Sequence, residues 1–268
     1  MRTIALVAVS VFKESVRDKV LYNLVGFAML LIAVSYLLGQ LTAGQDVKII
    51  KDLGLAAIAT FGLFIAVFIG IGLVWKEVER RSVYSLLSKP VRRSEFILGK
   101  YAGLALTLLV NVSIMTVAFY AVLAYLDTQF PDNVRASWPA PATDPRMLKA
   151  IVLIFVELLV VTAVALFLST FSSPFLSAAL TFGLWVIGHF NAELRNFEAV
   201  VESRPAAYIA RGLYYVLPNF AAFDVKTQVV HALPVPSSYV ATTAVYGVVY
   251  TSLLITAAIM IFGRRDFK

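Results

Sequence analysis

The sequence of 268 residues contains no cysteine and only two histidines. The missing cysteine excludes disulfide bonds, iron–sulfur clusters and cysteine-ligated zinc, and two histidines leave little for a histidine-rich metal site. Charged residues are also scarce, at 15% of the chain, whereas hydrophobic residues make up 60%. Soluble domains have about 45–50% apolar residues, so we interpret the chain as an integral membrane protein.

Motifs of nucleotide-using and hydrolytic enzymes are missing as well. The Gly-Lys pair at 99–100 lacks the upstream glycine and the following hydroxyl of a GxxxxGK[ST] phosphate loop. The patterns HExxH and GxSxG do not occur. We therefore predict no catalytic residue, no cofactor and no metal in this chain. The net charge of +7 does not indicate nucleic acid, because the basic residues flank apolar runs.

Long hydrophobic runs are what the sequence has in abundance. A membrane-crossing helix needs about 20 largely apolar residues, and the fifth of six candidate runs is the shortest. Ser173 followed by Pro174 marks the start of that fifth run. The fold class we expect is an all-α integral membrane protein with six transmembrane helices, at about residues 20–40, 53–75, 98–126, 148–170, 174–191 and 238–262.

Residues 1–19 precede the first of these runs and have a mixed character. Their apolar side chains share one helical face, while charged side chains lie on another. This pattern predicts an interfacial amphipathic helix, with an apolar face formed by Ala5, Ala8, Val9, Phe12 and Val16.

A strongly charged segment, residues 76–97, separates the second and third runs. It holds seven of the 23 basic residues when Lys100 is counted with it. Good helix formers and an apolar stripe predict a short surface helix that ends at Pro90, and Ser94 with Glu95 predicts the start of the next helix. We expect the segment to contact a partner through Glu77, Glu79, Arg80, Arg81, Val83, Leu86, Leu87 and Arg93.

The basic residues also predict orientation. Six spans put both termini and the 76–97 segment on one side, with four Lys or Arg before the first span, seven in the charged segment and three at the C-terminus. Nine are spread over the longer loops of the other side. By the positive-inside rule, both termini and the charged segment are cytoplasmic.

The largest loop, residues 192–237, lies on the opposite side. Its aromatic residues predict a helix or re-entrant segment at the outer interface. One interpretation is an aromatic belt, and the other is a docking surface for a periplasmic or extracellular partner. The aromatic residues in question are Tyr208, Tyr214, Tyr215, Phe220 and Phe223.

Small residues recur along one face of the second span, at Gly54, Gly62, Ala66 and Gly70. Such a face lets another helix backbone approach closely. Packing within one protomer, a dimer interface and the wall of a transport path all fit this pattern.

Glu157 stands near the middle of the fourth span. A charged group there costs about 2.5 kcal/mol or more unless it is paired, neutralised or facing water, so we expect it to point into the bundle. Two interpretations are open: contact with a translocated molecule or a gate, and a structural hydrogen bond to a polar partner such as Asn111 or Thr107. His189, near the end of the fifth span, is expected to be interfacial.

These features together resemble a known family. The entry helix, the charged segment ending in LLSKPVRRSEFILGKY, six spans and the tail FGRRDFK are similar to an ABC-2-type permease, the membrane subunit of an ABC exporter. Within the family, the loop sequence LYYVLPNFAAFDVKTQVVHALPVP looks most like permeases of multicopper-enzyme maturation, such as the nitrous-oxide-reductase accessory permease. The motif residues are Glu79, Arg80, Leu86, Leu87, Pro90, Arg93, Gly99 and Lys100.

The resemblance implies partners and a location. Two permease copies would pair in the plasma (inner) membrane of a bacterium or archaeon, and two separate ABC ATPases would bind ATP and magnesium below them. The 76–97 segment would be the coupling helix, and residues 1–268 would form a single transmembrane permease domain. Anchoring of that segment to anionic lipid is an alternative. Other functions that stay open are an ATPase-independent secondary transporter or channel, and a membrane scaffold for an extracytoplasmic assembly.

Overall fold

The computed structural model describes residues 2–40, 46–79, 92–191, 193 and 204–264. All regular elements within these residues are helical, so the all-α prediction is confirmed. The elements are α1 (Arg2–Val16), α2 (Lys19–Gln40), α3 (Asp46–Glu79), α5 (Arg93–Gln129), α6 (Asp132–Arg135), α7 (Met147–Ser169), α8 (Pro174–His189), α10 (Arg204–Val216), the 3₁₀ helix η2 (Phe220–Phe223), α11 (Lys226–Val230) and α12 (Ser237–Arg264).

Five helices of the described chain are long and apolar enough to cross a membrane: α2, α3, α5, α7 and α12. The predicted fifth span corresponds to α8, which has 16 residues. At 1.5 Å per residue it is about 24 Å long, whereas the hydrocarbon core is about 30 Å thick. The structure therefore supports five of the six predicted spans, and the fifth is a shorter helix.

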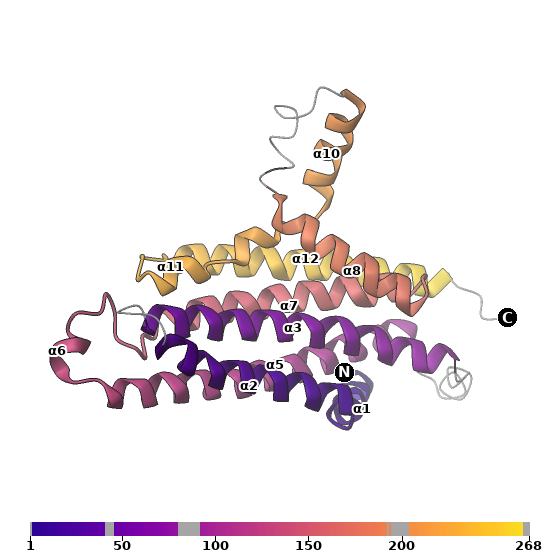
Figure 1. The fold of residues 1–268 in the computed structure, drawn as a ribbon. Helices are drawn as coiled ribbons and strands as arrows, with labels where there is room; N and C mark the ends of the chain where they lie inside the picture. The colour runs from indigo at the N-terminus through magenta and orange to yellow at the C-terminus, as the bar shows by residue number, and fades with distance from the viewer. Residues whose placement is uncertain (1, 41–45, 80–91, 192, 194–203, 265–268) are drawn as a thin grey trace.

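The spanning helices form one bundle with two distinct ends (Figure 1). The N- and C-termini lie toward one end, which we call the terminus end, and α6 and α11 lie at the other, which we call the distal end. Helix α7 is the centre of the bundle, because it packs against α3, α5, α8 and α12.

Two helix starts show how well local signals work. The Ser173 hydroxyl accepts a hydrogen bond from the backbone N–H of Leu176 (3.5 Å), and Pro174 begins α8, as predicted. Helix α5 begins earlier than the Ser94 signal predicts, because Arg92 is its N-cap. The Glu95 carboxylate accepts a hydrogen bond from the Arg92 N–H (3.4 Å), which stabilises this earlier start.

Helix α1 packs against α5 through Val7 and Val11, which lie outside the predicted interfacial apolar face. Glycines on α5 leave room for its backbone: a Cβ added to Gly99 would meet Val7, and one added to Gly103 would meet Val11 and the Ala8 carbonyl. Val11 is buried, whereas Val9 of the predicted apolar face is 46% exposed. The glycine groove of α5 thus selects the side of α1 that contacts it, and contact of the predicted apolar face with the membrane interface stays a prediction.

The 192–237 loop is more structured than a simple connection. Helix α10 projects from the bundle, at a steep angle to its long axis (Figure 1). Tyr208 and Tyr215 on α10 are 72% and 74% exposed, as surface aromatics would be. Phe220 and Phe223 are at most 1% exposed, so the aromatic-belt prediction is wrong for these two residues, which pack in the core.

Candidate functional site

The position of the fifth predicted span is shared by two separate segments. Helix α8 starts at the terminus end, and η2 and α11 continue toward the distal end, where α11 packs on α3 and α7. The junction is tight, because a Cβ added to Gly188 would lie 2.5 Å from the Phe220 ring and 2.6 Å from the Pro218 carbonyl oxygen. A backbone break thus occurs inside the bundle, beside the middle of α7.

Glu157 of α7 lies at this break. Its side chain is 8% exposed. The indole Nε1–H of Trp185, on α8, donates a 2.7 Å hydrogen bond to Oε1 of Glu157. His189, one turn further along α8, places Nε2 at 3.6 Å from the same oxygen.

The other contacts of His189 determine which ring nitrogen carries a proton and how the ring is oriented. Its Nδ1 is 3.0 Å from the backbone carbonyl of Trp185, and a carbonyl only accepts, so Nδ1 carries a proton. In the neutral ring Nε2 then has none, and two acceptors face each other at 3.6 Å. One proton on Nε2 or on Glu157 turns this approach into an attraction. Phe220 stacks on the ring at 5.9 Å and 21°, which fixes its plane.

Two further charged groups are Asp224, which caps the end of η2, and Lys226, the first residue of α11. Lys226 Nζ lies 3.3 Å from Asp224 Oδ2, and both groups are within electrostatic range of Glu157. We call Glu157, Trp185, His189, Asp224 and Lys226 the break cluster. It joins the buried Glu157 of α7 and two residues of α8 with Asp224 and Lys226, whose side chains are 36% and 24% exposed.

The break cluster combines hydrogen-bond donors and acceptors with titratable groups. In the part of the chain that the structure describes, no group of three His, Cys, Asp or Glu side chains could hold a metal ion. The buried carboxylate has a hydrogen-bond donor and a proton acceptor beside it, which offsets the free energy of placing it in the bilayer. A break in a membrane segment also brings backbone polar groups to the same place.

Asn111 and Thr107 do not partner Glu157, contrary to the proposed structural pairing. Asn111 Nδ2 donates to the Thr107 carbonyl (2.7 Å), and Thr107 Oγ1 donates to the Gly103 carbonyl (2.9 Å). Their polar groups are therefore satisfied within α5. Local geometry accounts for this outcome, since Thr and Asn side chains in a helix can donate a hydrogen bond to the backbone carbonyl one turn back.

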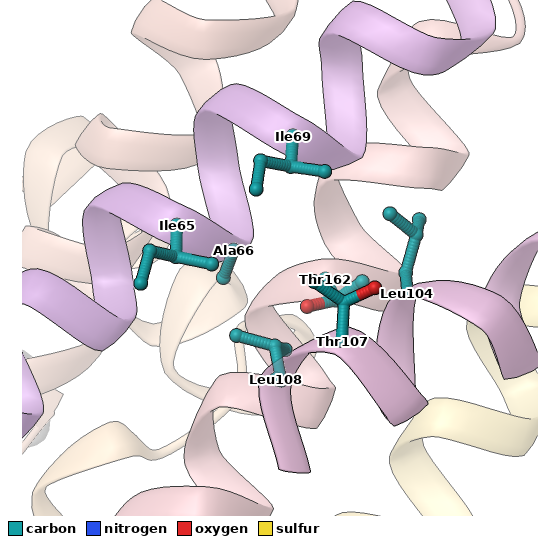
Figure 2. Close-up of a pocket in the computed structure, with 7 residues that line it drawn as sticks. All are labelled: Ile65, Ala66, Ile69, Leu104, Thr107, Leu108 and Thr162. Atoms are coloured by element: carbon teal, nitrogen blue, oxygen red, sulfur yellow. The ribbon is translucent and has the colours of Figure 1, made fainter. Parts of the chain in front are cut away.

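Figure 2 shows the interior where α3, α5 and α7 meet. The crevice there is too narrow to admit a water molecule. The Thr162 hydroxyl donates to the Leu158 carbonyl (2.7 Å) rather than into the crevice. This region is close packing within the protomer, formed by Ile65, Ala66, Ile69, Leu104, Thr107, Leu108 and Thr162.

The small-residue face of α3 lies against the same neighbours. A Cβ on Gly54 would overlap the Phe119 ring, and one on Gly62 would overlap the Leu158 side chain. At Gly70 an added Cβ would be 3.5 Å from the Ala165 Cβ. These positions therefore pack inside one protomer, and a role in a dimer or a pathway stays a prediction.

The predicted coupling residues fall mostly outside the described residues. Glu77 and Glu79 belong to the last turn of α3, and positions 80–91, with Arg80, Arg81, Val83, Leu86 and Leu87, lie beyond it. Arg93 begins α5, and its guanidinium donates to the carbonyls of Gly263 (2.8 Å) and Phe262 (3.3 Å) at the end of α12. Arg93 thus ties the start of α5 to the end of α12.

Sequence reasoning missed most of the break cluster. The signals were present: Trp185 and His189 are four residues apart and share a helix face, and the fifth run is short. Asp224 and Lys226 carry no such pattern. The path of the chain around η2 and α11 brings them near Glu157, and no periodic pattern in the sequence predicts that path.

Comparisons with known proteins agree with the fold. No curated protein matches the sequence. The family model described as ABC-2 family transporter protein matches residues 4–267, which is nearly the whole chain. The family is a membrane transport subunit that generally works with an ATPase subunit and is not itself catalytic. This multi-pass membrane protein therefore belongs to the ABC-2 transporter family, as the membrane component of an ABC transporter.

Proposed function

We propose that the chain is the permease subunit of an ATP-driven exporter and that a separate ATPase drives it. The family match over residues 4–267 is the observation that carries this proposal. The missing phosphate loop fits it, because the energy source has to reside in another polypeptide. The residues that couple the two subunits would be those of the 76–97 segment.

The geometry around that segment would let it transmit movement of an ATPase to the helices of the bundle. The apolar run of α3 ends at Trp75, and the helix continues to Glu79. Those four further residues extend α3 by about 6 Å at 1.5 Å per residue. On the other side of the segment, Arg93 links α5 to α12. A push by an ATPase on residues 80–91 would therefore reach α3, α5 and α12 together.

The break cluster is the part of the bundle that would respond. Helix α3 packs on α7, α8 and α11, so its displacement would change the contacts of Glu157 with Trp185 and His189. We propose that Glu157 gates the path or contacts the cargo at this break. If both Glu157→Gln and Glu157→Ala retain full transport, this role is excluded.

The partners and the location follow from the same proposal. Two copies of the chain would pair in the plasma membrane of a bacterium or archaeon, with both termini and residues 76–97 in the cytoplasm. Helix α10 and the rest of residues 192–237 would then face outward, where a periplasmic or extracellular partner can reach them. The cargo is not specified by these features.

An ATPase-retention assay tests the proposal. The permease, with its cognate ATPase, is purified from membranes, and the retained ATPase and its hydrolysis rate are measured. Arg80→Glu with Arg81→Glu should abolish both, because the reversed charges oppose docking. The matched control reverses two basic residues at the same end, Arg2→Glu with Lys13→Glu, and should retain the ATPase.

Equal loss in both double variants would instead favour anchoring of basic residues to anionic lipid. Transport that proceeds in vesicles without any ATPase would favour a secondary transporter, a class that also uses interrupted helices. Binding of an outer partner without any transport would favour the scaffold.

A further inference from the structure

A second polar site, separate from the break cluster, lies at the distal end of the bundle. A hollow of about 330 Å³ opens there between the first turns of α3 and α11. Ligand pockets commonly have volumes of about 300–1,000 Å³, so the hollow admits a small head group. Four polar side chains line it: Lys48, Asp52, Thr227 and His231.

Lys48 differs from the other buried or half-buried lysines near it. Lys51 Nζ donates to the Pro141 carbonyl (2.7 Å), and Lys149 Nζ donates to the Val235 carbonyl (2.6 Å). Within the described parts of the chain, Lys48 has no side-chain hydrogen bond or ion pair, and neither does Asp52. These two opposite charges are four residues apart on one face of α3 and are both open to the hollow.

The opposite wall adds two further hydrogen-bonding side chains and an apolar surface. Thr227 and His231 are one helical turn apart on and just after α11. Their side chains likewise make no hydrogen bond among the residues described. Ile49, Leu53 and Val230 complete the lining. The site thus offers a cation and two donors, a separate carboxylate, and aliphatic contact.

This distribution selects a ligand that carries both charges. A phosphate accepts hydrogen bonds from an ammonium, a hydroxyl and an imidazole, whereas an ammonium group pairs with a carboxylate. A simple anion would leave Asp52 facing it, and a simple cation would face Lys48. The hollow also lies where the uninterrupted apolar run of α3 begins, at Leu53, which is the depth at which lipid head groups meet a bundle.

We propose that this hollow binds a phosphoethanolamine group, with its phosphate beside Lys48, Thr227 and His231 and its ammonium beside Asp52. The group is carried by a membrane lipid, whose glycerol backbone contacts Ile49, Leu53 and Val230. The assignment does not depend on ATPase coupling, because it rests on residues of the distal end alone.

The test measures which lipids stay bound. The full-length permease is reconstituted in bilayers of equal phosphatidylethanolamine and phosphatidylglycerol, extracted, and analysed by native mass spectrometry. The wild-type chain should retain phosphatidylethanolamine preferentially. Asp52→Ala should lower that preference by about tenfold, the change expected for removing a hydrogen bond between charged groups, while phosphatidylglycerol stays bound. Lys48→Ala should lower retention of both lipids, because both carry the phosphate.

Arg146→Ala is the matched control, since Arg146 is an exposed cation at the same end and lies outside the hollow. It should retain lipid as the wild-type chain does. Thermal unfolding of each variant shows that the fold is kept, and Lys48→Arg should restore binding. Wild-type retention in both Lys48→Ala and Asp52→Ala, or equal loss in Arg146→Ala, overturns the proposal.

Soluble competitors identify the source of the group. If glycerophosphoethanolamine displaces the lipid only weakly, the ligand is a lipid. Displacement at equal concentration assigns the hollow to a free phosphoethanolamine compound instead. If inorganic phosphate competes as well as glycerophosphoethanolamine, Asp52 has no ligand partner and the zwitterionic assignment is wrong.

Discussion

Helices α3 and α7 differ from α2 and α12 in what they touch, although all four are apolar enough to cross a bilayer. In the most apolar part of each helix, 67% of α3 and 72% of α7 is buried inside the protomer, against 22% of both α2 and α12. Mean hydropathy follows the same order, at 2.4 and 3.0 for α3 and α7 against 2.1 and 2.0 for α2 and α12. The two buried helices are therefore the more apolar ones, and the helices with more polar residues lie at the outside of the protomer.

The exposed helices α2 and α12 present apolar side chains outward, and the Ser and Thr hydroxyls of α12 form hydrogen bonds within that helix. Phe27 on α2 and Leu253 on α12 are 61% and 63% exposed. The hydroxyls of Ser252 and Thr256 on α12 each donate 2.7 Å hydrogen bonds to the carbonyl one turn back. On the buried helix α7, the Thr162 hydroxyl likewise bonds the carbonyl one turn back, whereas the Glu157 carboxylate depends on Trp185 of another helix.

The largest expected effect comes from filling the glycine face of α3. Gly54→Leu should lower stability by about 3 kcal/mol, because the new side chain would overlap the fully buried ring of Phe119. Gly26→Leu on α2 is the matched change, since a Cβ there meets nothing within 4 Å. Both substitutions gain the same helix propensity, so the difference in thermal unfolding midpoint in detergent isolates packing. Equal midpoints would contradict the contrast between the two helices.

The next effect concerns the break cluster. Glu157→Ala should lower stability by about 1–3 kcal/mol, because it leaves the half-buried Trp185 N–H without an acceptor. Glu157→Gln retains an acceptor oxygen and should stay within about 1 kcal/mol of the wild type. The unfolding free energies of the two variants are compared in the same detergent. A larger loss for Gln than for Ala would show that the hydrogen bond to Trp185 is not what holds the site.

A smaller effect is expected where α5 meets the end of α12. Arg93→Ala removes the hydrogen bonds to the Phe262 and Gly263 carbonyls, worth about 1 kcal/mol. The loss is local, so hydrogen exchange should accelerate in the last turn of α12 and remain unchanged in α7. Arg92→Ala, one residue earlier and exposed, serves as the control. Faster exchange throughout the bundle would contradict a local tie.

The smallest effect is expected on the lipid-facing side. Ser252→Ala and Thr256→Ala on α12 should each change stability by no more than about 0.5 kcal/mol, because the hydroxyls only bond their own helix. The matched change in the interior is Thr162→Ala, at a buried position. A large destabilisation from Ser252→Ala would mean that this face of α12 contacts protein in the membrane.

The sequence predicts the helices of this fold better than their contacts. Long apolar runs and the Ser173-Pro174 signal determine helix type and several boundaries, because these depend on neighbouring residues. The inward position of Glu157 follows from the energetic penalty of a charge in lipid. Its partners could not be predicted, since His189 is brought into place by a junction that includes Gly188 and Phe220, which are far apart in the sequence.

The face of α1 illustrates the same limit. Its apolar residues occupy more than one side of the helix, so the choice between them depends on the glycines of α5. Hydrophobic periodicity identifies an amphipathic helix but does not include the shape of the surface it meets. The interrupted fifth span was missed for a related reason, because η2 and α11 are too short to have a periodic pattern.

The most direct test of the account is whether ATP used by a partner reaches the break cluster. The chain has three tryptophans, so Trp75→Phe with Trp138→Phe leaves Trp185 as its single tryptophan, beside Glu157. In membranes containing this variant and its ATPase in tryptophan-free form, the account predicts that ATP shifts the Trp185 emission and that the shift reverses after hydrolysis. An emission spectrum unchanged by ATP, while hydrolysis proceeds, would contradict the account.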